Sequence, residues 1–248
     1  MKINILTQFP DMFTATLGDS ILGRACENGL LEINVLNIRD FSLDKHRKTD
    51  DTPFGGGAGM LMTPQPAFDA LDSVGALGKR NLYMSPRGPI LDQTIAQSLA
   101  FEDEINILCG HYEGVDQRIL DYYSMEELSI GDYILTGGEL AAMVVIDTVA
   151  RLIPGVLGSP ESLAEESIYS GLLEYDQYTK PREYKGMEVP EVLFGGNHRL
   201  IRLWQFENSL RLTKERRPDL FQRFIAAPHS FTKDEKKILE KLTKEQNE

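Results

Sequence analysis

The sequence predicts an α/β fold in which helices cover both faces of a parallel sheet. Short apolar runs alternate with amphipathic stretches over residues 1–157, a pattern typical of such sheets. Three glycine-rich loops, at residues 54–60, 109–116 and 130–140, each follow or interrupt one of these runs. Ligands of parallel sheets bind beyond the carboxyl ends of the strands, where these loops should lie. The positions of the loops are therefore consistent with the predicted sheet, and they predict a ligand-binding pocket beyond its strand ends.

The elements of the sheet domain follow from this alternation. Five apolar runs are the predicted strands, namely Ile3–Leu6, Ile33–Ile38, Leu82–Met84, Ile105–Cys109 and Leu128–Ile130. Five amphipathic stretches are the predicted helices, namely Met12–Asn28, Pro66–Leu77, Asp92–Phe101, Asp116–Tyr123 and Gly138–Leu152. Pro154 and Gly155 follow the last of these helices and end it.

The remainder of the chain predicts a linker and a small helical domain. Residues 158–166 are small, polar and acidic, a composition typical of linkers. Asn197 fits the N-cap of a helix at His198–Arg217, and Lys233–Lys244 forms a final amphipathic helix. We therefore expect a sheet domain over residues 1–157, a flexible interdomain linker over 158–170 and a mainly helical domain over 171–248.

Composition excludes several classes of protein. No apolar stretch approaches the roughly 18 residues that a membrane span needs, and the N-terminus has no signal-peptide pattern. Cys26 and Cys109 lie too far apart to suggest a disulfide framework or a zinc site, so both are expected to be small buried hydrophobes. These features predict a cytoplasmic protein that does not bind membranes.

The charge is unevenly distributed along the chain. A net charge of −12 argues against a nucleic-acid partner, whose binders usually carry a basic surface. Residues 1–166, however, hold 11 Lys and Arg against 25 Asp and Glu, whereas residues 167–248 hold 15 against 13. The last third is therefore an electropositive region on an acidic body. Lysine-rich surfaces of ordinary helices explain this asymmetry equally well.

The glycine loops match none of the common nucleotide-binding motifs. The first predicted strand ends at Thr7–Asp11 without the G-x-G-x-x-G of a dinucleotide site, and residues 75–80 lack the P-loop spacing. What they do predict is a cleft lined by backbone, with Glu113, Asp132 and Glu139 nearby, which suits a cationic or hydroxyl-rich ligand. The alternative is that the loops are only left-handed turns. His111 could act as a base or be structural.

Seven segments together resemble the bacterial tRNA (guanine-N1)-methyltransferase family, which modifies guanosine 37, the nucleotide immediately 3′ of the anticodon. They run in order from residue 1 to about residue 220 and are Phe9–Phe13, Gly55–Met60, Ser85–Gly88, Cys109–Asp116, Ser129–Leu140, Arg151–Gly158 and Gly171–Pro181. An ordered set of this kind is far more specific than a single motif.

The resemblance implies a SPOUT-class fold, in which the C-terminal part of the sheet domain forms a deep trefoil knot. It implies S-adenosylmethionine bent into that knot and an obligate homodimer whose tRNA sites combine the knot of one chain with the C-terminal domain of the other. The residues that would bind the cofactor are Tyr83, Ser85, Pro86, Gly110, Tyr112, Glu113, Ser129, Ile130, Gly131, Asp132, Tyr133, Ile134, Leu135, Gly137 and Gly138. Those implied to bind tRNA are Gly56, Gly57, Gly59, Glu174, Tyr178 and Lys180.

The resemblance also assigns catalytic roles. Guanine N1 is a poor nucleophile until its proton is removed, so a carboxylate base and a guanidinium near O6 are needed. Arg151 fits the guanidinium, and Glu166 occupies the position of the family's aspartate base. Glu165 is the alternative base if the register differs by one. No dedicated metal site is visible, although acidic groups near the pocket could hold Mg²⁺ loosely.

Two other functions stay open. One is a knotted methyltransferase that acts on a different RNA atom, such as a ribose 2′-hydroxyl. The other is a non-catalytic RNA-binding protein with a degenerate pocket. The departures from the family pattern are Ala141, Lys180, Asp176 and Glu166, and none of them removes an essential group.

Overall fold

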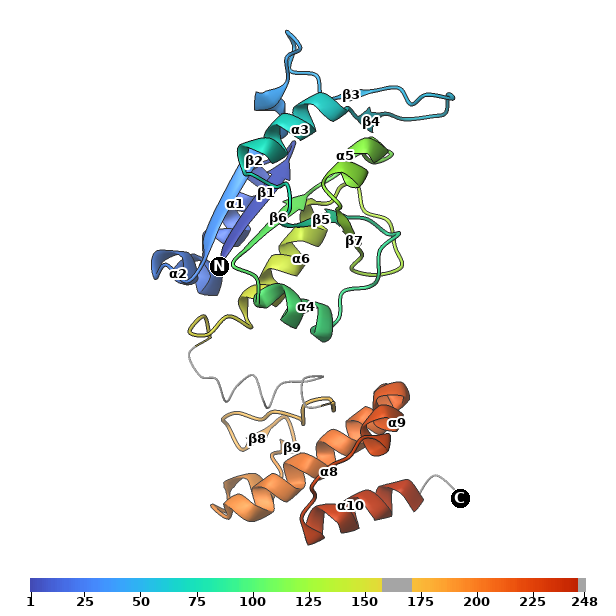
Figure 1. Cartoon of the computed structure of the whole chain (residues 1–248). Coiled ribbons are helices and arrows are strands. Elements are labelled where there is room, and N and C mark those ends of the chain that lie inside the picture. The colour runs from blue at the N-terminus through green and yellow to red at the C-terminus, as the bar shows by residue number, and fades with distance from the viewer. Residues whose placement is uncertain (158–170, 245–248) are drawn as a thin grey trace. The chain divides into compact units, whose positions relative to one another are not determined.

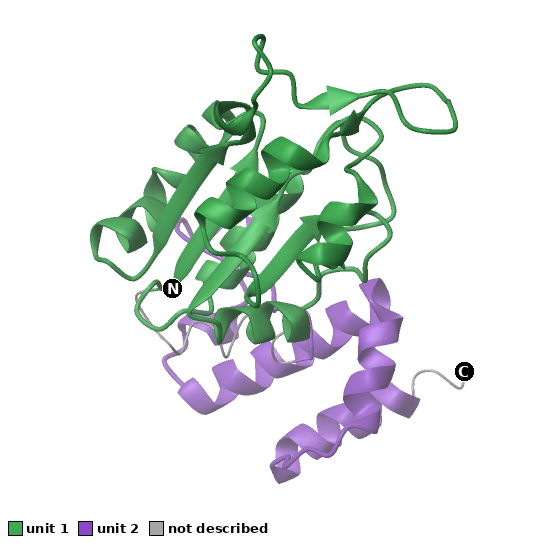
Figure 2. Ribbon diagram, turned by 45° about the horizontal axis from the view of Figure 1, so that its top comes forward, with its two compact units in different colours: residues 1–160 green, residues 161–248 purple. Residues whose placement is uncertain are grey.

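The computed structural model describes residues 1–157 and 171–244. The chain divides into two compact units, residues 1–160 and 161–248 (Figure 2). The predicted linker, 158–170, lies outside the described residues. No helix within residues 1–157 and 171–244 is both long enough and apolar enough to cross a membrane.

A five-stranded parallel sheet forms the centre of the first unit (Figure 1). Its order is β2 (Glu32–Asn37), β1 (Lys2–Thr7), β6 (Glu104–Leu108), β5 (Arg80–Met84) and β7 (Glu126–Leu128). Every neighbouring pair is parallel, as predicted. The observed strand β7 lies earlier in the chain than the predicted strand Leu128–Ile130, and the two share only Leu128.

Helices cover both faces of this sheet, which confirms the predicted layers. Alternate strand residues face opposite sides, so Ile3 and Ile5 belong to one core cluster and Leu6 to another. The first cluster includes residues of α1 (Asp11–Leu17), α2 (Ser20–Glu27), α4 (Gln93–Ala100) and α6 (Glu139–Ala150). The second includes residues of α3 (Pro64–Ser73) and α5 (Gln117–Tyr122).

One predicted helix, Met12–Asn28, is two helices in the structure. Gly18 ends α1, and its N–H donates to the Thr14 carbonyl oxygen. Asp19 is extended and caps α2, with its side chain accepting from the Ser20 N–H. The apolar periodicity continues through this break, which is why the pattern predicted a single helix.

A ladder of asparagine side chains crosses the sheet. Asn34 donates to Asn4 at 3.2 Å, Asn4 to Asn106 at 2.8 Å and Asn106 to Asn81 at 2.8 Å. These residues are also backbone register partners on adjacent strands. Asn81 completes the ladder by donating to the Tyr123 carbonyl oxygen at 2.9 Å. A one-residue slip of any strand would break the ladder, so it specifies the register that aligns the strand ends.

The glycine loop at residues 54–60 projects from the sheet domain (Figure 1). It joins two short antiparallel strands, β3 (Asp50–Asp51) and β4 (Leu61–Met62), which were not among the predicted strands. Gly55, Gly56 and Gly57 all have positive φ, and a Cβ on any of them would meet nothing. The loop tip is therefore open backbone.

The second unit is built mainly from helices. Its elements are β8 (Glu183–Tyr184), β9 (Met187–Glu188), α8 (His198–Arg216), α9 (Pro218–Ala226) and α10 (Lys233–Lys244). Leu172, Leu210, Phe221, Phe224 and Leu242 form its core. Asn197 caps α8 as predicted. The predicted end of the helix near Arg217 is confirmed, because α8 ends at Arg216. The helix α9 was not predicted; Pro218 directly follows α8 and occupies the first turn of this next helix.

Candidate functional site

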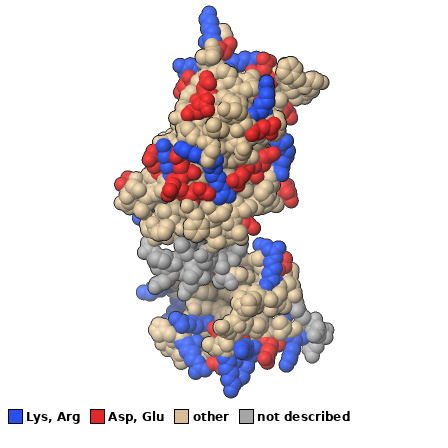
Figure 3. Space-filling model, viewed as in Figure 1, with Lys and Arg blue, Asp and Glu red and all other residues tan. Residues whose placement is uncertain are grey.

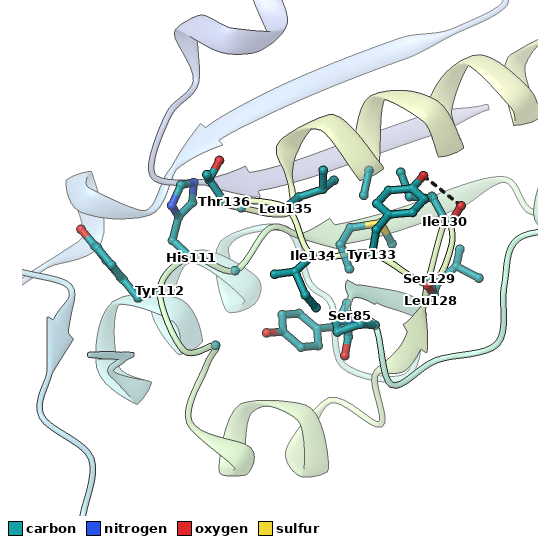
Figure 4. A pocket seen from close by; sticks show the side chains of 18 of the residues that line it. Ser85, His111, Tyr112, Leu128, Ser129, Ile130, Tyr133, Ile134, Leu135 and Thr136 are labelled. Atoms are coloured by element: carbon teal, nitrogen blue, oxygen red, sulfur yellow. Dashed lines mark hydrogen bonds between the residues drawn. The ribbon is translucent and has the colours of Figure 1, made fainter. Parts of the chain in front are cut away.

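A cavity of about 320 Å³ lies at the carboxyl ends of β5, β6 and β7. It is lined by residues 83–86, 110–114, 128–131 and 133–138, together with Ala141 (Figure 4). All residues predicted to bind the cofactor line this cavity except Asp132. The lining residues that sequence reasoning missed are Met84, His111, Gly114, Leu128, Thr136 and Ala141. All six lie within or directly next to the matched segments Ser85–Gly88, Cys109–Asp116 and Ser129–Leu140, so proximity to these segments was the available signal.

Main chain forms much of the wall because side chains would not fit there. A Cβ on Gly110 would lie 2.8 Å from the Tyr83 hydroxyl oxygen. A Cβ on Gly138 would lie 3.0 Å from both the Cys109 Cα and the Met84 Cβ. Gly131 and Gly114 have φ values of +153° and +119°, which other residues rarely adopt. The predicted glycine pocket is therefore present as a cavity.

Hydrogen bonds join the loops that form the cavity. The Gly138 N–H donates to the Gly110 carbonyl oxygen at 2.9 Å. The Met62 N–H donates to the Gly114 carbonyl oxygen at 3.0 Å, and the Glu113 N–H to that of Met60 at 3.1 Å. The glycine loop at 54–60 is thus attached at its base to the loop after β6, but none of its residues lines the cavity, so only two of the three glycine loops form the pocket.

The turn after β5 is held by a carboxylate. Ser85 Oγ donates to Glu127 Oε2 at 2.6 Å, and Arg87 Nε donates to the same oxygen at 2.8 Å. The Arg87 N–H also donates to Ser85 Oγ at 3.2 Å. These contacts fix the position of Ser85 in the cavity wall.

Burial affects two ionisable side chains in or beside the cavity wall. Burial raises the pKa of the Tyr83 hydroxyl, and burial together with the charge of Glu139 raises the pKa of the Cys109 thiol well above its usual range. The Glu139 side chain is 1% exposed, and its Oε2 lies 2.9 Å from His111 Nε2. Cys109 is therefore an inert thiol, as expected from the sequence.

The catalytic candidates are only partly described. Arg151 is half-buried and is the C-cap residue of α6, outside the set that lines the cavity. Glu165 and Glu166 lie outside the described residues. Within residues 1–157 and 171–244, no group of three His, Cys, Asp or Glu side chains could hold a metal ion.

The predicted tRNA residues lie on both units. Gly56, Gly57 and Gly59 belong to the β3–β4 loop, and a Cβ on Gly59 would overlap the Glu113 side chain. Glu174, Tyr178 and Lys180 belong to the second unit, where the Tyr178 and Trp204 rings lie 6.3 Å apart. Figure 3 shows Lys and Arg side chains spread over this unit.

The comparisons with known proteins agree with this architecture. The architecture is a parallel α/β unit with a backbone-lined pocket, followed by a mainly helical unit. The model of the tRNA (Guanine-1)-methyltransferase TrmD family matches residues 1–223. The chain belongs to this family.

Curated relatives named tRNA (guanine-N(1)-)-methyltransferase are similar over nearly their whole length. The protein of Clostridium perfringens (strain 13 / Type A) is 54% identical over 224 residues, which cover 90% of this chain and 94% of the relative. That of Clostridium acetobutylicum is 51% identical and covers 96% of both chains. That of Clostridioides difficile is 49% identical over 90% of this chain and 98% of the relative.

Proposed function

We propose that this protein transfers a methyl group from S-adenosylmethionine to N1 of guanosine 37 in tRNA. The observation that carries the proposal is the glycine-lined cavity at the ends of the parallel strands, in a chain that matches the family over residues 1–223. An enzyme acting on tRNA also accounts for the excess of Lys and Arg after residue 166.

The cavity suits the methyl donor. Its volume is within the usual range for small-molecule sites, and a Cβ on Gly110 or Gly138 would intrude on its packed wall. Main-chain groups of residues 130–138 would bind the polar edges of the donor, and Ile130 and Leu135 its apolar surface. Glu113 provides a carboxylate that favours a cationic ligand. When bound, S-adenosylmethionine supplies an electrophilic methyl group on its sulfonium.

Two side chains would carry the chemistry on guanine. Glu166 would accept the N1 proton while the N1 electron pair bonds to the methyl carbon and the carbon–sulfur bond of the donor breaks, which leaves S-adenosylhomocysteine. Such base assistance contributes typically about 10²–10⁴ in rate. Arg151 stabilises the negative charge that spreads onto O6. Glutamate can replace aspartate here, because its intrinsic pKa is similar, at about 4.3 against about 3.9. Its extra methylene adds reach.

The proposal includes the deep trefoil knot of the SPOUT class within residues 1–157. The path of the chain after β7 supports it. From this edge strand the chain returns to the middle of the sheet, where Gly138 bonds to Gly110 and Glu139 bonds to Thr7 at the end of β1. The helix α6 then packs against α1 and α4.

We further propose that residues 171–248 bind tRNA and that the linker over 158–170 carries the base. Aromatic side chains beside cationic ones suit a nucleic-acid surface. The Trp204 ring centroid lies 6.4 Å from that of Tyr175 and 6.3 Å from that of Tyr178. The guanidinium carbon of Arg182 lies 4.2 Å from the centroid of the Phe194 ring. The tRNA contacts proposed for the second unit are Glu174, Tyr178 and Lys180. Those proposed for the first unit are Gly56, Gly57 and Gly59.

A homodimer with shared active sites completes the proposal. Apolar side chains of α1 and α6 are unusually exposed for packed helices, with Met12 at 42%, Leu140 at 50% and Val144 at 45%. Phe9 adds a further 37% exposed ring just before α1. A second copy would cover such a face. We also propose a cytoplasmic location, which agrees with action on tRNA. Any Mg²⁺ would be held loosely by acidic groups near the pocket.

Identification of the product nucleoside tests the reaction. We expect label from the methyl donor to appear in bulk tRNA as N1-methylguanosine, measured by mass spectrometry after digestion. A methyl group found on ribose would support the 2′-hydroxyl alternative. No labelled nucleoside, together with no calorimetric heat at sub-millimolar S-adenosylmethionine, would favour the non-catalytic RNA-binding protein.

A further inference from the structure

The first unit contains a buried carboxylate that the proposed chemistry does not use. Glu139 is the first residue of α6 and is 1% exposed. Its Oε1 accepts a hydrogen bond from Thr7 Oγ1 at 2.7 Å, and its Oε2 lies 2.9 Å from His111 Nε2. A buried charge is costly unless it is paired and hydrogen-bonded, and here both oxygens have a partner.

These three side chains come from three separate parts of the fold. Thr7 ends β1, His111 lies in the glycine loop after β6, and Glu139 begins α6 after the glycine loop at residues 130–138. Thr7 Oγ1 also accepts from the Phe9 N–H at 2.9 Å, so this hydroxyl uses both its donor and an acceptor position. The positive end of α6 further favours the charge on Glu139.

The network lies directly behind two walls of the cavity. His111 and Gly137 both line the cavity and form a backbone bridge, and His111 lies beside Thr136 in Figure 4. A Cβ on Gly137 would overlap both the His111 ring and the Glu139 carboxylate. The carboxylate itself does not line the cavity. It can therefore set the separation of the two loops without contacting what they bind.

We propose that Glu139 is a positioning residue that holds the two glycine loops, 109–114 and 130–138, at the spacing that the methyl donor requires. This inference rests on the proposed function, because it assumes that the cavity binds S-adenosylmethionine. Positioning of the walls affects every ligand of this shape equally. The donor and its demethylated product, S-adenosylhomocysteine, share that shape and differ in the charge on sulfur.

The consequence is specific. Loss of the network weakens the affinity for donor and product by the same factor, whereas loss of a direct electrostatic contact weakens that for the cationic donor alone. Glu139→Gln keeps the size of the side chain and removes its charge. Thr7→Val keeps the branched shape of the side chain and removes the hydroxyl, and Thr7→Ser restores that hydroxyl. Thr94, an exposed residue of α4 outside the cavity, provides the matched control Thr94→Val.

Calorimetric titration of the full-length variants with both ligands tests the proposal. We expect Kd for both to rise about tenfold in Glu139→Gln and several-fold in Thr7→Val, as is typical of lost charge-assisted or supporting contacts. Thr7→Ser and Thr94→Val should stay within about twofold, the range of near-neutral substitutions. At saturating donor, kcat should change less than KM for the donor.

Three results would overturn it. They are unchanged affinities in both Glu139→Gln and Thr7→Val, a lower melting temperature with unchanged affinities, and weaker binding of the donor alone. Titration of the unmodified protein with both ligands distinguishes a failure of this inference from a failure of the proposed function. If the parent binds neither ligand, the cavity is not a methyl-donor site. If it binds both, the variants decide the role of Glu139.

Discussion

At the scale of single residues, the pocket and the catalytic pair differ in how they are encoded. Pocket residues such as Gly110 and Gly138 are required by geometry, because a Cβ at either position would intrude on a packed wall. Arg151 and Glu166 have no such local signature. Their roles come from family resemblance and from the proton and charge movements that N1 methylation demands.

The assignment of the base can be tested with adjacent glutamates. Glu166→Gln should lower kcat by about 10²–10⁴, because the side chain can no longer accept the N1 proton. The affinity for S-adenosylmethionine should be unchanged. Glu165→Gln is the matched control and should retain the turnover of the parent. Measured under single-turnover conditions, the reverse pattern would transfer the role of base to Glu165.

The family resemblance implied most of the cavity lining, whereas the glycine loops by themselves predicted only a pocket at the carboxyl ends of the strands. Sequence reasoning missed His111 as a pocket residue and left its role open between base and structural group. Its buried partner, Glu139, is far away in sequence and was known only as an acidic residue near the cleft. Asp132, predicted with its neighbours, does not line the cavity.

At the scale of elements, the asparagine ladder links four strands through buried side chains. Asn4, Asn81 and Asn106 are each at most 1% exposed and lie among apolar residues. Removing one asparagine side chain leaves the polar groups of its neighbours buried without hydrogen-bond partners. This lowers the free energy of unfolding more than replacing both members of a bonded pair.

The ladder predicts a large loss of stability from a side chain of similar size. Asn106→Leu should lower the free energy of unfolding by about 2–4 kcal/mol, because it leaves buried amide groups unpaired. Asn34→Leu, at the less buried end of the ladder, should cost about 1 kcal/mol or less. Urea denaturation measures both. Equal losses in the two variants would contradict a role for the buried ladder.

The strands and helices of the first unit were predictable because their buried residues recur along the sequence with the period of a strand or a helix. The errors occurred where a short local signal overrode that periodicity. Gly18 and Asp19 divide one predicted helix into two. In the second unit, Pro218 follows the end of α8 and also begins α9, a helix that was not predicted. The two-residue strands β3 and β4 carry too few residues to show alternation.

At the scale of the whole molecule, the proposal needs a second copy of the chain. Val144 and Leu140 are about half exposed on α6, and this helix packs against α1, where Met12 is also exposed. Threading of the chain, dimerisation and the relation of the two units are long-range properties. Local patterns cannot predict them, and here they entered through the family resemblance.

A charge on this face should separate the copies. Val144→Glu is expected to give a monomer in sedimentation velocity at micromolar concentration, since an unpaired buried charge disrupts an apolar interface. Methyl transfer should be lost with it, because each active site draws on both chains. Leu77→Glu is the control, at a 63% exposed position away from α1 and α6. A dimeric, fully active Val144→Glu would place the interface elsewhere.

The central claim is that the glycine-lined cavity presents a methyl donor to N1 of guanosine 37. Primer extension on two tRNA transcripts, one with guanosine and one with adenosine at position 37, tests it most directly. A methyl group on N1 blocks base pairing, so reverse transcriptase should stop at position 37 only in the guanosine transcript and only when S-adenosylmethionine is present. Full-length extension of that transcript, or a stop at another position, would contradict the account.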